Sequence, residues 1–220
     1  LAQARLLSHA ADFVQVTGEI ERVGFRHIGA FGFEPALEAF RVKHARQALG
    51  RRHAAMMAAL ACVATMIIRI PSPMQGYVNL GDAVVLMCGW ILGPIYGVAA
   101  AGIGSMLADI LAAYPYYAPG TLVIKAVVAL IAYVLFTALR RGKEQNTKNL
   151  ILPLVISGIA GEIAMVVLYF VYASLLLGKG WAAAASIPGN LMQGLVGIIV
   201  GAALYVLISK SKALPHLFKE

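Results

Sequence analysis

Charged residues are scarce in this chain. Only 13% of its 220 residues are Asp, Glu, Lys or Arg, whereas 60% are hydrophobic. A soluble domain of this size carries roughly a quarter charged residues, because it needs them to cover its surface. From residue 53 onward the sequence instead runs in long apolar stretches that single charges interrupt. Lipid is the solvent that suits such a pattern, so we predict an all-α membrane protein.

Cysteine and histidine are also few, and their positions exclude several kinds of chemistry. Cys62 and Cys88 fall inside apolar stretches, with neither metal-ligand spacing nor a disulfide framework, and read as small buried hydrophobes. None of the five histidines lies deep in an apolar stretch. An intramembrane hydrolase would need a Ser–His pair or metal ligands there. We therefore predict no enzymatic activity, no bound metal and no cofactor.

Six apolar stretches approach the ~20 residues that a helix needs to cross a bilayer. They lie at 53–70, 82–96, 97–113, 119–139, 150–177 and 186–208. The second and third are short and share a tight turn around Gly93 and Pro94, which leaves open whether they are tilted or fail to reach both faces. The predicted fold is a compact bundle of six transmembrane helices.

The basic residues indicate the orientation of this bundle. Lys and Arg gather before the first stretch, in the loop 140–148 and after residue 209. The loops at 71–81, 114–118 and 178–187 carry one cation between them, Lys179. Because cytoplasmic loops are enriched in Lys and Arg, both termini are predicted to be cytoplasmic. The same placement explains the net charge of +8, so nucleic acid is not a predicted partner.

Residues 1–52 do not fit the membrane pattern. They are mixed in character, contain no signal-peptide apolar core, and precede the first methionine, Met56. We predict a cytoplasmic N-terminal extension of doubtful authenticity, with a native start near Lys43; a real cytoplasmic helix around 34–50 is the alternative. The transmembrane domain is then 53–210, followed by a cytoplasmic tail at 211–220.

Polar side chains within the apolar stretches are the candidate site residues, since in hydrocarbon each needs a partner, a ligand or water. Glu162 lies near the middle of the fifth stretch, with Tyr169 two turns further along. Asn190 and Gln193, three residues apart, share a face at the start of the sixth. Two amides on one face suit heteroaromatic ring edges and hydroxyl groups. Hydrogen bonding between helices is the alternative role of this amide pair.

A second group of polar residues is predicted at the outer ends of the stretches. Asp109 and Lys125 lie at similar depth, where they either bind a ligand or pair with each other. Asp82 begins the second stretch, and we interpret it as a helix cap that complements the helix dipole. Tyr77 and Asn79 precede it on the outer loop and are candidates to close over a ligand. With Glu162 as the floor, these residues predict a site that opens outward.

Small residues form one face of the first stretch. Ala54, Ala58 and Ala61 recur at helical spacing, and in lipid such a face lets another helix approach closely. Packing within the bundle and docking of a separate membrane protein are both compatible with this pattern.

Five segments, taken together and in order, resemble a known family. They are RIPSPMQGYVNLGD at 69–82, LGPIYG at 92–97, GIGSMLAD at 102–109, YPYYAP at 114–119 and PGNLMQ at 188–193. They are similar to the substrate-binding S component of energy-coupling factor (ECF) transporters, in the branch for riboflavin, hydroxymethylpyrimidine and pyridoxine-type substrates. The resemblance covers about 53–208 and leaves the cargo open.

The resemblance implies a six-helix subunit that binds a vitamin or precursor from the outer face. It also implies partners: a transmembrane T component and two cytoplasmic ATPases, onto which Ala54, Ala58 and Ala61 would dock. The missing Gly-rich phosphate loop agrees with energy supplied by a partner. Few aromatics near the site mildly favour a one-ring cargo over riboflavin. A self-sufficient proton-coupled transporter is the main rival, although the repeated halves typical of such carriers are not evident.

Overall fold

The computed structural model describes residues 33–72, 76–141 and 147–211. The chain divides after Gln47 into two compact units, of which residues 48–220 hold every candidate site residue. In the first unit, the described residues form the beginning of helix α2 (Phe33–Ile67), and their described side chains, such as Glu38 and Arg41, are exposed. The alternative of a helix around 34–50 agrees with α2, while the predictions for residues 1–32 lie outside the described residues.

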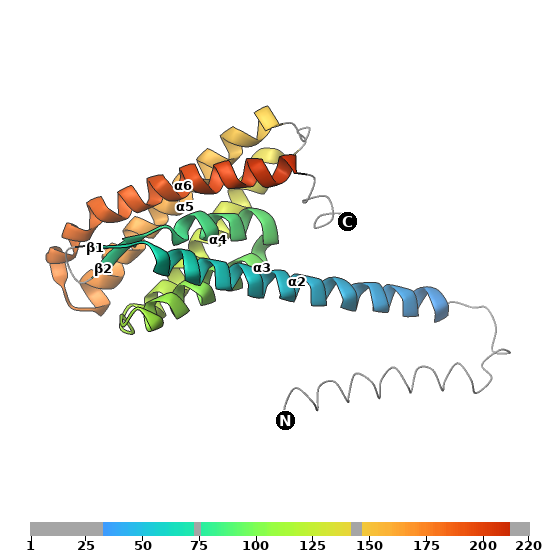
Figure 1. Cartoon of the computed structure of the whole chain (residues 1–220), viewed down its shortest axis with the longest axis horizontal. Coiled ribbons are helices and arrows are strands. Elements are labelled where there is room, and N and C mark those ends of the chain that lie inside the picture. The colour runs from blue at the N-terminus through green and yellow to red at the C-terminus, as the bar shows by residue number, and fades with distance from the viewer. Residues whose placement is uncertain (1–32, 73–75, 142–146, 212–220) are drawn as a thin grey trace, which may run out of the picture. The chain divides into compact units, whose positions relative to one another are not determined.

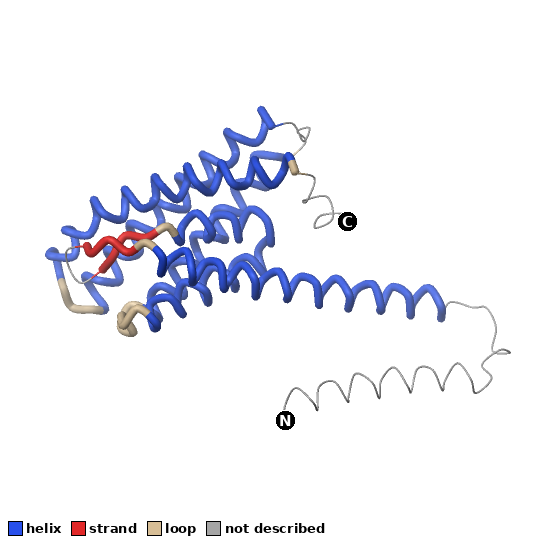
Figure 2. The backbone as a smooth tube through the Cα atoms, in the orientation of Figure 1, coloured by secondary structure: helices blue, strands red, loops and turns tan. Residues whose placement is uncertain are grey.

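The second unit is predominantly helical (Figures 1 and 2). After α2 come two short strands, β1 (Arg69–Ser72) and β2 (Gly76–Asn79), and then α3 (Gly81–Leu111) and α4 (Ala118–Arg140). Helix α5 (Thr147–Val171) continues into the π-helix η2 (Tyr172–Leu176); the 3-10 helix η3 (Gly180–Ser186) leads into α6 (Ile187–Lys210). Within the described residues, four helical segments are long and apolar enough to cross a membrane: Gly81–Leu111, Ala118–Arg140, Asn149–Leu176 and Gly180–Lys210.

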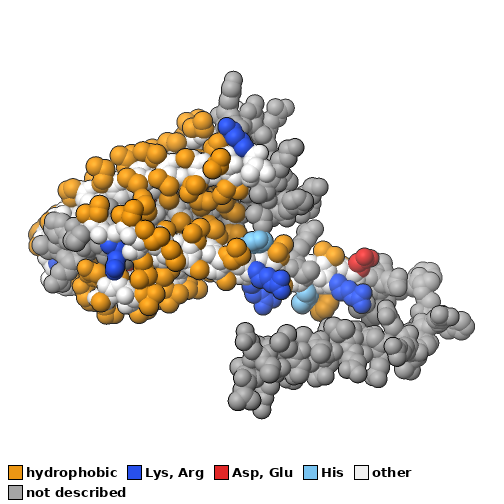
Figure 3. Space-filling model, viewed as in Figure 1, with side chains coloured by type: hydrophobic (Ala, Val, Ile, Leu, Met, Phe, Trp, Pro, Cys, Tyr) orange, Lys and Arg blue, Asp and Glu red, His pale blue; other side chains and the backbone are white. Residues whose placement is uncertain are grey.

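The outer surface of the bundle is apolar. Hydrophobic side chains cover the face seen in Figure 3, and large ones project from α3, α4, α5 and α6. Examples are Ile103, Val123, Ile163 and Ile199, all 44–61% exposed. A water-soluble protein would turn such residues inward, so this surface fits a lipid environment. The prediction of an all-α membrane protein is confirmed, with the small β1–β2 ribbon as an addition.

Helix α3 contains a sharp reversal that the sequence predicted as a turn between two short spans. Gly93 has φ 76° and ψ −167°, a backbone conformation open essentially to glycine alone. A side chain on Gly97 would overlap the carbonyl oxygen of Cys88, so the segment after the turn lies directly against the segment before it. The stretch 81–111 is therefore two helices packed together rather than one long rod.

The β1–β2 ribbon was not predicted. Its strands pair antiparallel, with Arg69 opposite Asn79 and Tyr77 opposite Pro71. Each strand has only four residues, too few for a periodic pattern to stand out in the sequence. Strand β2 ends at Asn79, two residues before α3 begins, and this position places Asn79 in contact with the site residue Gln193.

Close packing of helices forms the core. Leu86, Val128, Leu154 and Met165, from α3, α4 and α5, are fully buried. On the side of the core nearer Arg140, the indole Nε1 of Trp90 donates a hydrogen bond to Ser157 Oγ at 3.0 Å. Such a bond lets a large aromatic residue be buried without losing its hydrogen-bond partner.

Candidate functional site

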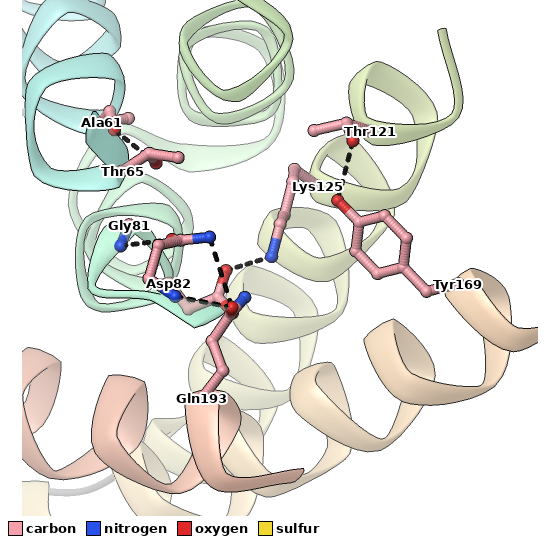
Figure 4. Close-up of polar contacts among 9 residues, drawn as sticks. Ala61, Thr65, Gly81, Asp82, Thr121, Lys125, Tyr169 and Gln193 are labelled. Atoms are coloured by element: carbon pink, nitrogen blue, oxygen red, sulfur yellow. Dashed lines mark hydrogen bonds and ion pairs between the residues drawn. The ribbon is translucent and has the colours of Figure 1, made fainter. Parts of the chain in front are cut away.

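A buried ion pair lies at the centre of the site (Figure 4). Asp82 in the first turn of α3 pairs with Lys125 of α4, and their side chains are 0% and 4% exposed. Gln193 of α6 adds a third partner, because its Nε2 donates a hydrogen bond to Asp82 Oδ2 at 2.6 Å. A charge pair survives away from water only when its remaining hydrogen-bonding capacity is satisfied. One carboxylate therefore connects three helices.

The ribbon joins this cluster through Asn79. Its backbone N–H and its side-chain Nδ2 both donate to Gln193 Oε1, at 2.9 and 3.3 Å. In turn, the N–H of Gly81 donates to Asn79 Oδ1 at 2.8 Å, which orients the amide. Gln193 thus has its oxygen fixed toward the ribbon and its nitrogen fixed toward Asp82.

The structure corrects our interpretation of Asp82. We predicted a helix cap, but α3 has no side-chain capping hydrogen bond, and the carboxylate instead accepts from Lys125 and Gln193. Asp82 is therefore the central residue of this cluster, which sequence reasoning did not include among the candidate site residues. The signal that could have identified Asp82 was Lys125, because a buried ammonium group requires an acidic partner. Asp82 was one of the few acids in the apolar part of the sequence.

Glu162 of α5 is a second buried acid beside this cluster. Its side chain is nearly fully buried, and neither Oε1 nor Oε2 receives a hydrogen bond from the described residues. It lies near enough to Asp82 and Lys125 for their charges to interact. On the α6 side it faces Gly194, where an added Cβ would come within 3.1 Å of Oε2. Glycine at that position leaves room for the carboxylate against the helix backbone.

Tyrosines lie on the other side of Lys125. The Tyr169 hydroxyl is 2.9 Å from Thr121 Oγ1, and the Lys125 ammonium lies 5.4 Å from the centre of the Tyr169 ring (Figure 4). Such a separation is within the range of a cation–π interaction. The Tyr117 ring follows at 6.5 Å from the Tyr169 ring. Lys125 is therefore held between an acid and an aromatic face.

The comparisons with known proteins cover this same part of the chain. The family model described as "ECF-type riboflavin transporter, S component" matches residues 52–210. The chain belongs to this family.

Two similar proteins accompany this family match, and one of them is a solved structure of an S component. A Pyrococcus woesei protein, described as an uncharacterized protein in a gap 3′ region, is 36% identical over 149 residues, covering 67% of this chain and 93% of the relative. A solved structure described as "Structure and mechanism of the S component of a bacterial ECF transporter" matches with a TM-score of 0.55 and 25% identity, over 74% of this chain and 97% of that one. The protein is thus the S component of an ECF transporter, a multi-pass protein of the cell membrane from a transporter family and not an enzyme family.

The remaining predicted residues of this S component are less tightly joined to the cluster. Asp109 is buried near the end of α3, and Asn190 is half-buried in the first turn of α6. Tyr77 lies in β2, but its side chain is outside the described part of the structure. The predicted set therefore has a connected centre, formed by Asn79, Lys125 and Gln193, and a periphery whose roles stay predictions.

The small face of α2 in this S component packs inside the bundle. Ala61 is fully buried, Ala54 and Ala58 are half-buried, and all three contact the core. A side chain on Gly104 of α3 would overlap the Ala58 carbonyl oxygen, so the two helices touch through their backbones there. Of the two predicted roles, packing is visible in the structure, and docking through these alanines stays a prediction.

Proposed function

We propose that this S component captures a B-vitamin or vitamin precursor from the outer face of the membrane. It then delivers the cargo through a T component driven by two cytoplasmic ATPases. The observation that carries the proposal is the buried Asp82–Lys125 cluster inside a bundle with an apolar surface. The match to the family of ECF transporter S components supports it. Charged side chains within a membrane are expensive and mark ligand paths by default.

The site residues divide into a scaffold and a contact group. Asp82, Lys125, Gln193 and Asn79 satisfy one another, so they define a rigid frame. Glu162 and Tyr169 border that frame and supply a carboxylate and an aromatic ring, which are the groups a heteroaromatic ligand uses. The proposed ligand site is completed by Asn190, Asp109 and Tyr77.

The proposed topology has six crossings, with both termini cytoplasmic. The second half of α2 would be the first crossing. The second and third crossings would be the two parts of α3, with the chain reversing direction at Gly93. The basic residues Arg140, Arg141 and Lys210 would then face the cytoplasm. The ribbon and the turn before α4 would face outward, next to the cluster.

The structure suggests which side of α2 is free to dock. Because Ala58 and Ala61 pack inward, the exposed positions Ala55 and Ala59, four residues apart, form the outward small face of the same helix. We include this face in the proposal as a further contact with the T component, beside the predicted one at Ala54, Ala58 and Ala61. Ala59→Leu should weaken assembly while ligand binding is retained. The matched control Val134→Leu, at an exposed residue of α4, should leave both assembly and ligand binding unchanged.

The test of the transport mode is uptake by cells that contain this protein with or without the T component and ATPases. We expect vitamin uptake only with the full set and ligand binding in both cases. Uptake that persists in cells lacking the module would favour the proton-coupled carrier, in which Glu162 would carry the proton.

The test of the site is ligand binding by purified variants. Glu162→Ala removes a carboxylate of the proposed contact group, and Gln193→Ala removes the amide that holds Asp82 and Asn79 in the frame. Each should weaken binding by about tenfold or more. Glu38→Ala provides a matched control, because Glu38 is an exposed acid in the first unit. If both site variants bind like the control, the cluster is not the ligand site.

A further inference from the structure

A row of tyrosine rings connects the buried cluster with the turn between α3 and α4. The sequence indicated few aromatic residues near the site, but the fold brings tyrosines from this turn, from α5 and from η2 together. Resting on the proposed function, we infer that Tyr116, Tyr117 and Tyr172 form an outer subsite. There the planar heteroaromatic ring of the cargo binds by stacking before it reaches Lys125. This subsite is separate from the acid–base cluster and selects for a flat ring rather than for one vitamin.

The continuity of the row is the first step of the argument. Tyr169 lies within cation–π range of Lys125, and its ring centre is 6.5 Å from that of Tyr117. The ring centre of Tyr117 is in turn 5.3 Å from that of Tyr116 and 6.2 Å from that of Tyr172. Aromatic rings attract each other at centre separations of about 4.5–7 Å. A guest ring can therefore exchange one aromatic neighbour for the next along the row.

The change in exposure along the row is the second step. Tyr116 is 41% exposed, Tyr117 and Tyr169 are half-buried, and Lys125 is buried. In the proposed topology the turn before α4 lies on the outer side of the membrane. The ring of Tyr116 is then the one that a solute meets first, and the row leads from it toward the cluster.

The hydrogen bonds of the tyrosines are the third step. The Tyr172 hydroxyl donates to the carbonyl oxygen of Tyr116 at 2.8 Å, and the Tyr117 hydroxyl accepts from Lys179 Nζ at 3.1 Å. A side chain on Gly120 would overlap the Tyr172 ring, so this ring rests against the backbone of α4. The rings are thus held in place through contacts that already use these two hydroxyl groups. Stacking tolerates many ligands, because every heteroaromatic ring has a π face. The choice among cargoes therefore falls to the acid–base cluster.

The experiment is stopped-flow binding to the full-length protein in detergent, followed by intrinsic fluorescence. The probes are pyridoxine, 4-amino-5-hydroxymethyl-2-methylpyrimidine and riboflavin. If binding passes through an outer subsite, the observed rate levels off as the probe concentration rises. The half-saturating concentration then measures the affinity of that subsite.

The variants separate the ring of Tyr116 from its other contacts. Tyr116→Leu removes the ring but keeps an apolar side chain and the carbonyl group that accepts from Tyr172. Tyr116→Phe keeps the ring and removes the hydroxyl. Tyr133→Leu is the matched control, at a half-buried tyrosine further along α4.

We expect Tyr116→Leu to raise the half-saturating concentration by about threefold or more for each probe that binds, because one aromatic neighbour is lost. The equilibrium Kd should change by less than about twofold, because the final site does not include this ring. Tyr116→Phe and Tyr133→Leu should both match the unchanged protein.

Three results would overturn the inference while the binding of a probe leaves the proposed function standing. They are an unchanged half-saturating concentration in Tyr116→Leu, a rate that rises linearly with concentration in the unchanged protein, and a Tyr116→Phe variant as impaired as Tyr116→Leu. Binding of none of the three probes, together with no vitamin uptake by the full transporter, would overturn the proposed function and the inference with it.

Discussion

Removing one member of the Asp82–Lys125 pair should strongly destabilise the bundle, and Lys125→Met tests this. The substitution keeps an unbranched side chain of similar length but removes the ammonium. Among the described residues, Gln193 then remains as the donor to the fully buried Asp82. Removing one member of a buried pair costs about 3–5 kcal/mol, because the other charge stays buried. For a chain of this size that corresponds to a drop in Tm of about 6–20 °C.

The assay is thermal unfolding in detergent, with a double variant and a surface control. Asp82→Asn combined with Lys125→Met removes both charges, and it should recover most of the lost stability because neutral replacements of buried pairs are often tolerated. Lys210→Met removes an exposed cation from the last turn of α6 and should cost about 1 kcal/mol or less. The reasoning would be refuted if Lys125→Met behaved like Lys210→Met, or if the double variant were no more stable than the single one.

Three further substitutions probe the fold. Gly93→Ala should lower the unfolding free energy by about 1–3 kcal/mol, because a Cβ is strained at its φ of 76°, and a Tm unchanged from wild type would contradict this. Ser157→Ala leaves the buried Trp90 Nε1 without its acceptor and should cost about 1–3 kcal/mol, seen as lower Tm and altered tryptophan fluorescence; an identical spectrum would argue against the bond. Tyr172→Phe removes the hydroxyl that donates to the Tyr116 carbonyl at 2.8 Å and should cost about 1 kcal/mol, which chemical denaturation can measure.

The membrane character and the general course of the helices were predictable, and the reason is physical. Long apolar runs leave few alternatives to helices in lipid, since every backbone polar group must be bonded within the segment. Gly93 and Pro94 signalled the reversal in α3 because glycine and proline have strong local effects on the backbone. These features depend on the sequence nearby, so a single chain is enough to find them.

The pairing within the site was less predictable. Lys125 and Gln193 were identified as polar residues within apolar stretches, and Asn79 as a candidate on the outer loop. The acid that connects them, Asp82, was interpreted as a helix cap. Asp82 and Gln193 are 111 residues apart, and their contact depends on how α3 meets α6. Local pattern shows which side chains need partners, but the choice of partner follows from helix packing. The inward face of α2 is a similar case, because Ala58 meets Gly104 only in the folded bundle.

The amide of Gln193 has a consequence for how the outer side opens. One carboxamide holds the ribbon with its oxygen and the acid with its nitrogen. Moving Asn79 away would remove both donors from that oxygen and loosen the side chain that holds the buried Asp82. In the proposed topology the ribbon lies on the outer side. Opening beneath it would break these contacts, so we expect a solute that replaces them to stabilise the open form.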